Sequence, residues 1–209
     1  MPAPLVVSDH PLVLHKLARL RAADTPPPAF RELVYEISQV LFYEATRDVR
    51  LKDVTVRTPL ADCPARVVAD KIGLIPVLRA GLGMADAMLD SFPDAVVWHV
   101  GLYRDHVTLK PVEYYNKLPA APGLDVALVL DPMLATGGSA IATLDILKRA
   151  GVPRLKFLGL IAAPEGVAAL RAAHPDVPAY LAAVDERLNE VGYIVPGLGD
   201  AGDRQFNTL

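Results

Sequence analysis

The stretch from residue 125 to residue 150, DVALVLDPMLATGGSAIATLDILKRA, constrains the fold of this chain more than any other. Residues 126–130 are apolar and rich in branched side chains, which predicts a strand buried on both faces. A loop of small residues follows. Apolar residues then recur at helical spacing, and Gly151 has the position of a helix C-cap. A buried strand that passes through a short loop into a helix predicts an α/β fold with a mostly parallel central sheet flanked by helices.

The loop between this strand and this helix has the composition of an anion-binding site. Gly137 and Gly138 let backbone N–H groups turn inward, and the helix that follows directs its positive end toward the loop. Thr136 and Ser139 add hydroxyl groups. Asp131, at the end of the strand, would face a diol or a metal ion. The loop therefore predicts a phosphosugar site, although TGGS taken alone could be an ordinary tight turn, and no Walker pattern GxxxxGK[ST] occurs.

The chain from residue 72 onward repeats this strand–helix pattern. Further strands are predicted at 72–78, 95–103, 155–161 and 179–184, and further helices at 84–89 and from Pro164. The intervals suit right-handed βαβ crossovers, and ligands of such sheets bind at the carboxyl ends of the strands. Arg79, Arg104 and Asp131 all fall at such ends, so we expect them to form one site.

Two arginines at strand ends are candidates for binding a diphosphate. A guanidinium group can donate a forked pair of hydrogen bonds to phosphate oxygens, which suits Arg79 and Arg104. Taken alone, Arg79 favours the interpretation of an ordinary surface residue at a strand end, and only its company with the other candidates points to a site. The polar segment 104–119, with two prolines and paired tyrosines, predicts a flexible hairpin that closes over a charged ligand. Lys110 and Lys117 are candidate helpers in that segment, or solvated loop charges.

A helical arm of residues 1–50 precedes the first strand–helix unit. Pro11 follows a polar cluster that is typical of a helix N-terminus. In a second helix, apolar residues within 30–41 recur at i, i+3, i+4 and i+7. The arm could cover the core or mediate dimerisation, and dimerisation is favoured because so much apolar surface needs a partner. An exposed strand at 53–58 and a turn at 59–64 are expected next.

The composition narrows the classes of function. The length of 209 residues favours a single domain. The formal net charge is −3 and no basic block is present, which argues against a nucleic-acid partner. The single cysteine, Cys63, excludes an internal disulfide, agrees with a reducing compartment and is expected to be structural. No signal-peptide pattern and no membrane-spanning run of roughly 18 apolar residues is found, so we expect a soluble cytoplasmic protein.

Several separated segments resemble one family. VLRAGLGM, DPMLATGGS and YIVPGLGDAGDR, together with HPLVLHKLARLR and YEATRD, resemble segments of the uracil phosphoribosyltransferases, a branch of the type I phosphoribosyltransferases. Pro132 and Ala135 stand where other branches often have acidic residues, and these departures are typical of the uracil branch. Asn207 stands where the family usually has glycine, and asparagine tolerates the left-handed backbone conformation.

The resemblance implies a type I phosphoribosyltransferase fold in which residues 185–209 form a base-binding hood. It implies transfer of the 5-phosphoribosyl group of 5-phospho-α-D-ribose 1-diphosphate (PRPP) to the N1 nitrogen of uracil, giving UMP and diphosphate in pyrimidine salvage. Catalysis would come from Arg79, Arg104 and Asp131. The implied PRPP contacts are Arg79, Arg104, Asp131, Pro132, Met133, Leu134, Ala135, Thr136, Gly137, Gly138, Ser139 and Asp200. The implied uracil contacts are main-chain groups of Ile194, Gly199, Asp200 and Ala201.

The resemblance also bears on metal, backbone and partners. Mg²⁺ would be carried mainly by PRPP, with a contact to Asp200 left open, and neither an HExxH motif nor a Cys/His cluster offers a protein-built metal site. A cis peptide bond without proline is implied close to Arg79. A homodimer or higher homo-oligomer is expected, and regulation by GTP is left open.

Two other classes of function fit parts of the sequence. An RNA-binding regulator that senses uridine nucleotides would need a basic face, and this acidic chain shows none. A nucleotide-binding oxidoreductase would need the GxGxxG motif, which GLGMAD fails because its last position is Asp86. A phosphoribosyltransferase is therefore the preferred interpretation.

Overall fold

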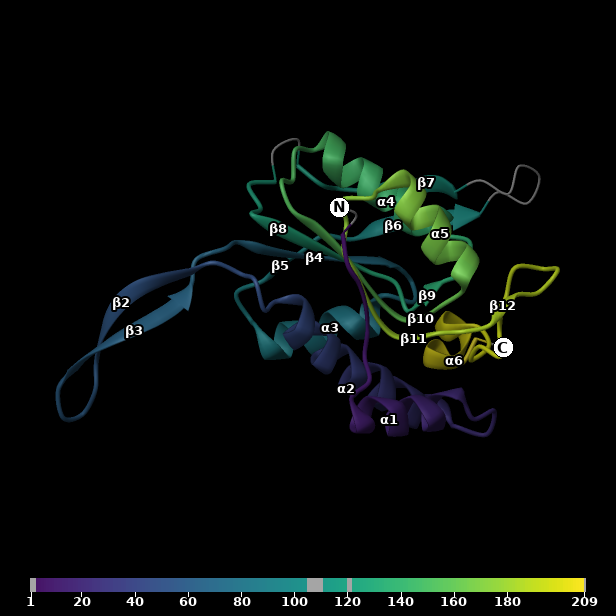
Figure 1. The fold of residues 1–209 in the computed structure, drawn as a ribbon, viewed down its shortest axis with the longest axis horizontal. Helices are drawn as coiled ribbons and strands as arrows, with labels where there is room; N and C mark the ends of the chain where they lie inside the picture. Colours follow the sequence, from purple (N-terminus) through teal and green to yellow (C-terminus); the bar gives the residue numbers. More distant parts are fainter. Residues whose placement is uncertain (1–2, 105–110, 120–121, 209) are drawn as a thin grey trace.

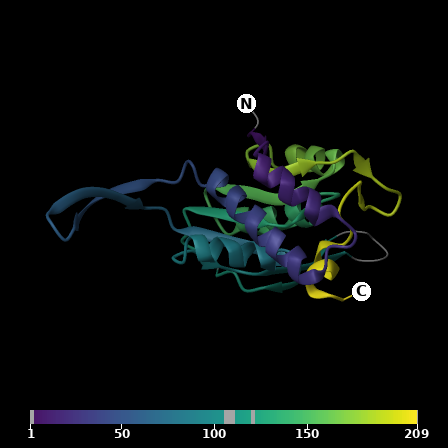
Figure 2. The same cartoon turned by 90° about the horizontal axis from the view of Figure 1, so that it is seen from below.

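A central β-sheet carries helices on both faces, and a long two-stranded hairpin extends away from this body (Figure 1, Figure 2). The computed structural model describes residues 3–104, 111–119 and 122–208. Within these residues, none of the helices combines the length and the apolar character needed to cross a membrane.

The sheet is mostly parallel, as the sequence predicts. Its main path runs in the order β1 (Leu5–Val7), β11 (Ala179–Val184), β10 (Leu155–Ala162), β8 (Val126–Leu130), β4 (Ile72–Leu78), β6 (Val100–Arg104) and β7 (Pro111–Asn116). Two short strands, β5 (Val96–Val97) and β9 (Met133–Leu134), pair with β4 and β10. The pairs along the path are parallel except β6–β7, which is antiparallel. The predicted α/β fold is therefore confirmed.

The strand predicted at 95–103 is interrupted in its middle. Val97 pairs with Leu74 of β4 and Val100 pairs with Val77, so β5 and β6 keep one register along β4. The predicted strand thus lies where the sequence places it, with a local break between its two parts.

Helices cover both faces of the sheet (Figure 1). On one face lie α1 (Pro11–Arg21), α2 (Pro27–Ala45), α3 (Leu82–Ser91) and the short α6 (Ala201–Phe206), and on the other lie α4 (Gly138–Arg149) and α5 (Pro164–Ala173). Proline stands in the first turn of α1, α2 and α5, where its missing N–H has no helical partner to lose. His10 caps α1, because its Nδ1 accepts a hydrogen bond from Leu12 N–H at 3.2 Å.

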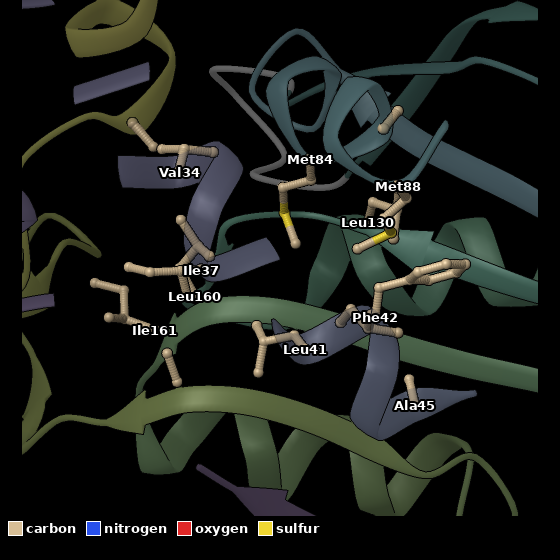
Figure 3. Packing of buried hydrophobic residues seen from close by; sticks show 14 of the residues in the cluster. Val34, Ile37, Leu41, Phe42, Ala45, Met84, Met88, Leu130, Leu160 and Ile161 are labelled. Atoms are coloured by element: carbon tan, nitrogen blue, oxygen red, sulfur yellow. The ribbon is translucent and has the colours of Figure 1, made fainter. Parts of the chain in front are cut away.

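The apolar face of α2 forms much of the core on its side of the sheet. Figure 3 shows this packing, in which buried side chains of α2 meet those of α3, β8 and β10: Val34, Ile37, Leu41, Phe42 and Ala45 against Met84, Met88, Leu130, Leu160 and Ile161. The apolar face of α2 is therefore covered within the chain itself, whereas Leu12 and Leu14 of α1 and Tyr43 of α2 are exposed. Uncovered apolar surface on α2 thus gives no argument for dimerisation, and a dimer stays a prediction.

The projecting hairpin consists of β2 (Leu51–Arg57) and β3 (Asp62–Val68), paired antiparallel (Figure 2). The sequence predicts the first strand and a turn at 59–64; the turn is confirmed for residues 59–61, but residues 62–64 belong to β3. Thr58 N–H donates to Ala61 O at 3.0 Å, and Thr58 Oγ1 accepts from Ala61 N–H at 3.0 Å. These bonds close the turn before β3 begins.

Cys63 and Pro64 consequently lie in β3. Both strands of a two-stranded hairpin are edges, and proline is tolerated in an edge strand. The Cys63 thiol is free and exposed, and the expectation that Cys63 is structural stays a prediction.

A buried carboxylate ties the base of this hairpin to the sheet. The side chain of Asp70, which follows β3, is fully buried. It accepts hydrogen bonds from Arg50 N–H at 2.8 Å and from Arg50 Nε at 2.5 Å, and it pairs with Arg154. Arg50 also pairs with Asp125, which accepts from Lys71 N–H at 2.8 Å. The two ends of the hairpin are thereby held beside the residues that precede β4, β8 and β10.

The electrostatics of this clamp give it a defined pH dependence. Burial by itself raises the pKa of Asp70, but hydrogen bonds from the Arg50 backbone and from the Arg154 and Arg50 guanidinium groups outweigh it and lower the pKa from 3.8 to about 2. A carboxylate with a lowered pKa stabilises the folded chain above its unfolded-state pKa. That contribution is lost as the pH falls from the unfolded value toward the folded one.

We expect Asp70→Asn to lower the free energy of unfolding at pH 7 by about 1–3 kcal/mol, because the two arginines lose a charged acceptor. Urea unfolding from pH 7 down to pH 3 measures the effect, and the difference from wild type should begin to shrink below pH 4. Asp62→Asn is a matched control, since Asp62 is exposed and lies 3.8 Å from Arg57. Equal stability of Asp70→Asn and wild type at pH 7 would show that the clamp contributes nothing.

Candidate active site

Two adjoining cavities lie at the carboxyl ends of β4 and β8. The smaller, about 60 Å³, is lined by Asp131, by residues 133–137 that follow β8, and by the first residues of α4, 138–140. The larger, about 250 Å³, lies between the end of β4 and the C-terminal segment, with Arg79 and Asp200 in its wall. Asp131 and Ser139 line both cavities, so the two are parts of one site. The structure thus places Arg79, Asp131, Asp200 and the loop around one cleft.

Two glycines shape the loop between β8 and α4. Gly137 has a φ of +83°, in the left-handed region that favours glycine, and it is the N-cap residue of α4. Gly166 of α5 packs so closely against the loop that a Cβ there would collide with the carbonyl oxygens of Leu134 and Ala135. The first residues of α4, 138–140, line the smaller cavity, and N–H groups at a helix start lack partners within the helix. This arrangement suits a phosphate group.

Main-chain hydrogen bonds hold the start of this loop to the sheet. Asp131 N–H donates to Leu158 O at 3.1 Å. Pro132 O accepts from the N–H groups of Leu160 and Ile161 at 3.0 and 3.1 Å. Pro132 therefore supports the loop through its carbonyl group.

The Asp131 carboxyl group stands where the two cavities meet. Loss of solvent around it raises its pKa from 3.8 to about 6, and the negative charge of Asp200 acts in the same direction. A hydrogen bond from Met133 N–H to Asp131 Oδ1, 3.2 Å long, opposes this rise. A carboxyl group that titrates near neutrality beside a second carboxylate suits a ligand that brings hydroxyl groups or a cation.

Arg79 follows β4, and 56% of its side chain is exposed. The peptide bond between Leu78 and Arg79 is cis, as the resemblance implies. Arg79 Nη2 lies 3.3 Å from Asp203 Oδ1, and the guanidinium carbon lies 5.9 Å from the centre of the Phe206 ring. Among the described residues, Arg79 is the only cationic side chain that lines the larger cavity. It is therefore already in contact with α6.

The other cationic residues predicted from the sequence are Arg104, Lys110 and Lys117, and only the side chain of Lys117 is among the described residues. Arg104 is the last residue of β6, but its side chain lies outside the described residues, as does the whole of Lys110. Lys117 is exposed, with its Nζ 5.9 Å from the centre of the Tyr115 ring. Tyr114 and Tyr115 on β7 are exposed as well. The cavity walls described above do not include Lys117 or either tyrosine.

The C-terminal segment contains a short helix, α6, that sequence reasoning missed. Asp200 caps it, because Asp200 Oδ1 accepts from Asp203 N–H at 2.9 Å. The helix ends at Asn207, whose φ of +55° confirms the expected left-handed conformation. An acid at the N-cap and a second acid three residues later are a recognisable helix-start signal, and that pattern could have revealed α6.

Of the residues expected to contact uracil, Asp200 lines the larger cavity. Gly202, which was not among the predicted contacts, lines the same cavity. Ile194 and Ala201 are buried, and Gly199 has a φ of +79°. These three residues shape the turn behind Asp200 and do not belong to the described cavity wall.

Arginines attach this C-terminal segment to the helical arm. Arg21 of α1 forms a forked ion pair with Asp185 and donates from Nη1 to Gly197 O at 2.8 Å. Arg204 of α6 donates to carbonyl groups at the end of α1 and lies 4.4 Å from the centre of the Phe30 ring. Sequence reasoning missed both arginines, because their partners are far away in the chain and leave no local pattern.

The donor set around the cleft bears on the implied Mg²⁺. Asp131 and Asp200 both face the larger cavity and offer carboxylate oxygens, which Mg²⁺ prefers. Among the described residues, no group of three or more histidine, cysteine or acidic side chains is arranged to hold a metal ion. The residues present therefore fit an ion that arrives with most of its ligands already supplied by a substrate and by water.

The mostly parallel sheet, the glycine-containing loop between β8 and α4 and the acid before that loop define a type I phosphoribosyltransferase fold. A hypoxanthine phosphoribosyltransferase from Trypanosoma cruzi, 12% identical, has a related fold, with a TM-score of 0.52 over 76% of this chain and 75% of that chain. The chain belongs to the uracil phosphoribosyltransferase family, because the sequence model of that family matches residues 7–208.

Similar proteins extend over the whole chain. The uracil phosphoribosyltransferase of Roseiflexus sp. (strain RS-1) is 63% identical over 206 residues, which are 99% of this chain and 99% of that protein. The solved structure of the AQ2163 protein from Aquifex aeolicus is 37% identical and has a TM-score of 0.92, covering 97% of this chain and 98% of that chain.

The close packing at Gly166 gives a test of the loop. We expect Gly166→Ala to weaken PRPP binding by roughly tenfold or more, because an added methyl group must push the 134–135 carbonyls out of place. Calorimetry with PRPP in the absence of uracil measures the affinity. Gly151→Ala is the control, since its φ of +77° makes alanine unfavourable while no atom lies within 4 Å. It should cost stability and leave PRPP affinity unchanged. Wild-type affinity in Gly166→Ala would contradict the assignment of the loop.

Proposed function

We propose that this chain transfers the 5-phosphoribosyl group of PRPP to the N1 nitrogen of uracil, giving UMP and diphosphate for pyrimidine salvage. The observation that carries the proposal is the single cleft where a phosphate-binding loop, the Asp131 carboxyl group and the Arg79 guanidinium group converge. PRPP has a phosphate at one end, hydroxyl groups in its middle and a diphosphate at the other end, in the same order. Membership in the family supports uracil as the acceptor.

The 5-phosphate of PRPP is assigned to the smaller cavity. Its oxygens would accept hydrogen bonds from the N–H groups of residues 135–139 and from the hydroxyl groups of Thr136 and Ser139. The other loop residues, 132–134, support these donors through their main-chain bonds to the sheet. Asp131 would accept hydrogen bonds from the ribose hydroxyl groups, which fixes the sugar between the two cavities.

The diphosphate is assigned to the larger cavity. As the bond between ribose and diphosphate breaks, positive charge develops on the ribose and negative charge on the leaving group. Arg79 stabilises that negative charge, with Arg104 at the neighbouring strand end as a second proposed contact. Phosphoribosyltransferases generally use Mg²⁺ with PRPP, and the ion supplies further positive charge beside the diphosphate. Asp200, and Asp131 beside it, are the residues that would hold it.

Uracil is assigned to the space beneath the C-terminal segment. Its edge presents an acceptor, a donor and an acceptor, and we propose that main-chain groups of Ile194 and of residues 199–201 read this pattern. The Asp200 carboxylate is directed to the ribose or to Mg²⁺ instead. Ala135 has no acidic side chain, so no side chain of the loop serves as a general base for N1.

Diphosphate release with uracil and PRPP tests this function directly. We expect kcat/KM for cytosine to be lower than for uracil by about 10⁴–10⁵, because cytosine would leave buried polar groups of the protein without partners. The measurement is diphosphate production with each base and with no base as the blank. Failure to release diphosphate with uracil would refute the proposed function. Comparable turnover of cytosine would refute the main-chain recognition of uracil.

The raised pKa of Asp131 predicts a pH-dependent use of PRPP. Only the ionised carboxylate can accept hydrogen bonds at both oxygens, so kcat/KM for PRPP should rise with pH through about 6, the pKa of Asp131 in the free protein. PRPP phosphates titrate in the same range, so the profile must be compared with that of Asp131→Asn. The variant should be less active and should lack the part of the rise that belongs to Asp131.

Stability separates this role from a structural one. Because the folded pKa of Asp131 is raised, the chain loses stability as the pH rises from about 4 to about 6. Asp131→Asn should therefore be at least as stable as wild type above pH 6 while losing activity. Loss of stability at that pH, or an unchanged pH profile, would contradict the role given to Asp131.

We further propose that the chain is a homo-oligomer. The β2–β3 hairpin supports this, because an isolated two-stranded hairpin is marginally stable in water and this one exposes apolar side chains. They are Leu51, Val56, Leu60 and Val67. Regulation by GTP and a cytoplasmic location stay predictions from the sequence.

A further inference from the structure

Arg79 already has an anionic partner within the chain. Its Nη2 lies 3.3 Å from Asp203 Oδ1, and its guanidinium carbon lies 5.9 Å from the centre of the Phe206 ring. Both partners belong to α6, the helix that Asp200 caps. The reaction described above makes no use of the Asp203 carboxylate, yet this carboxylate contacts the cation assigned to the diphosphate.

We propose that Asp203 is a positioning residue that serves as the resident counter-ion of Arg79, and that the diphosphate group must displace it in order to bind. The proposal rests on the proposed function, because it takes Arg79 as a contact of the diphosphate. It assigns to Asp203 a role in setting how tightly the diphosphate is held before and after the chemical step.

The Asp203 carboxylate is fixed in place independently of Arg79. Its Oδ1 accepts a hydrogen bond from Thr208 Oγ1 at 2.5 Å, and its N–H group donates to the capping residue Asp200. The same oxygen atom faces Arg79 Nη2. The Asp203 carboxylate therefore keeps its position when the Arg79 side chain moves away. It can pair with Arg79 again when the ligand dissociates.

The ion pair is weak enough to be exchanged. The side chain of Arg79 is 56% exposed and that of Asp203 is 31% exposed, and ion pairs so accessible to water contribute little. A diphosphate carries more negative charge than a carboxylate, and it offers oxygens for a forked pair of hydrogen bonds. The diphosphate therefore binds Arg79 in preference to Asp203, and part of its binding free energy is used to break the contact between Arg79 and Asp203.

The backbone around Arg79 is held in place whether Arg79 pairs with Asp203 or with the diphosphate. Gln205 of α6 is fully buried, and its Nε2 donates to Ala80 O and to Ala201 O, each at 3.0 Å. Arg31 Nη1 donates to Gln205 O at 2.7 Å and holds α6 to α2. Only the Arg79 side chain has to move when its partner changes, so removing the charge of Asp203 should leave the loop in place.

The experiment measures binding of inorganic diphosphate, in the presence of Mg²⁺, to the full-length protein by calorimetry. Asp203→Asn keeps the shape of the side chain and removes its charge. We expect it to bind diphosphate about two- to fivefold more tightly than wild type, the range that a partly exposed ion pair gives. Product inhibition by diphosphate should strengthen by the same factor. Asp203→Glu retains the charge and should bind as wild type does.

Two further variants assign the effect to Arg79. In an Arg79→Ala background, Asp203→Asn should leave the affinity unchanged, because no cation remains for Asp203 to compete for. Asp86→Asn removes one negative charge from an exposed position on α3 and should also change nothing. Thermal unfolding of Asp203→Asn checks that α6 is retained.

An affinity of Asp203→Asn that equals or falls below that of wild type would overturn the proposal. Equal tightening in the Arg79→Ala background would overturn it too, since the effect would then be a general one of charge. Either result leaves the proposed function standing if the wild type still releases diphosphate from PRPP with uracil. A wild-type protein that neither binds diphosphate nor turns over PRPP would remove both proposals together.

Discussion

The burial of β8 between β4 and β10 is the constraint on which the cleft depends. Residues 126–130 are buried and pair on both sides, so a shift of register would displace a whole set of core contacts. The strand therefore delivers Asp131 to one defined point. The next residue, Pro132, accepts hydrogen bonds from β10 through its carbonyl group and so holds the loop to the sheet. Gly166 packs closely against the loop and restricts its conformation. The shape of the proposed phosphate-binding loop is a consequence of this packing.

The other half of the cleft depends on contacts between distant parts of the chain. The helical arm packs its apolar face into the core and turns arginines toward the C-terminal segment, where Arg21 meets Asp185 and Arg31 meets the end of α6. Gln205 then joins α6 to the loop that carries Arg79. The wall that faces the proposed diphosphate site and the segment proposed to bind uracil are thus one connected unit.

Charges of both signs are arranged along the cleft so that each has a defined neighbour. Asp131 and Asp200 repel one another, and together with burial this keeps the pKa of Asp131 near 6. Arg79 is paired with Asp203. The hydroxyl groups and the bound cation of a ligand such as PRPP can relieve the repulsion between Asp131 and Asp200. Its diphosphate can replace Asp203 as the partner of Arg79. The cleft is therefore preorganised for the proposed binding of PRPP, and among the described residues Asp131, Asp200 and Arg79 each have a charged neighbour in the free protein.

The sequence by itself determined the elements whose signals are local. The run at 126–130, the small loop and the helical spacing after it predicted β8, its loop and α4 correctly, because burial, glycine and helix periodicity act within a few residues. Only the tertiary structure decided the partner of the arm's apolar face, the clamp at Asp70 and the attachment of α6 through Arg204. These are contacts between residues far apart in the chain, and a sequence pattern states that a group needs a partner without stating which partner the fold supplies.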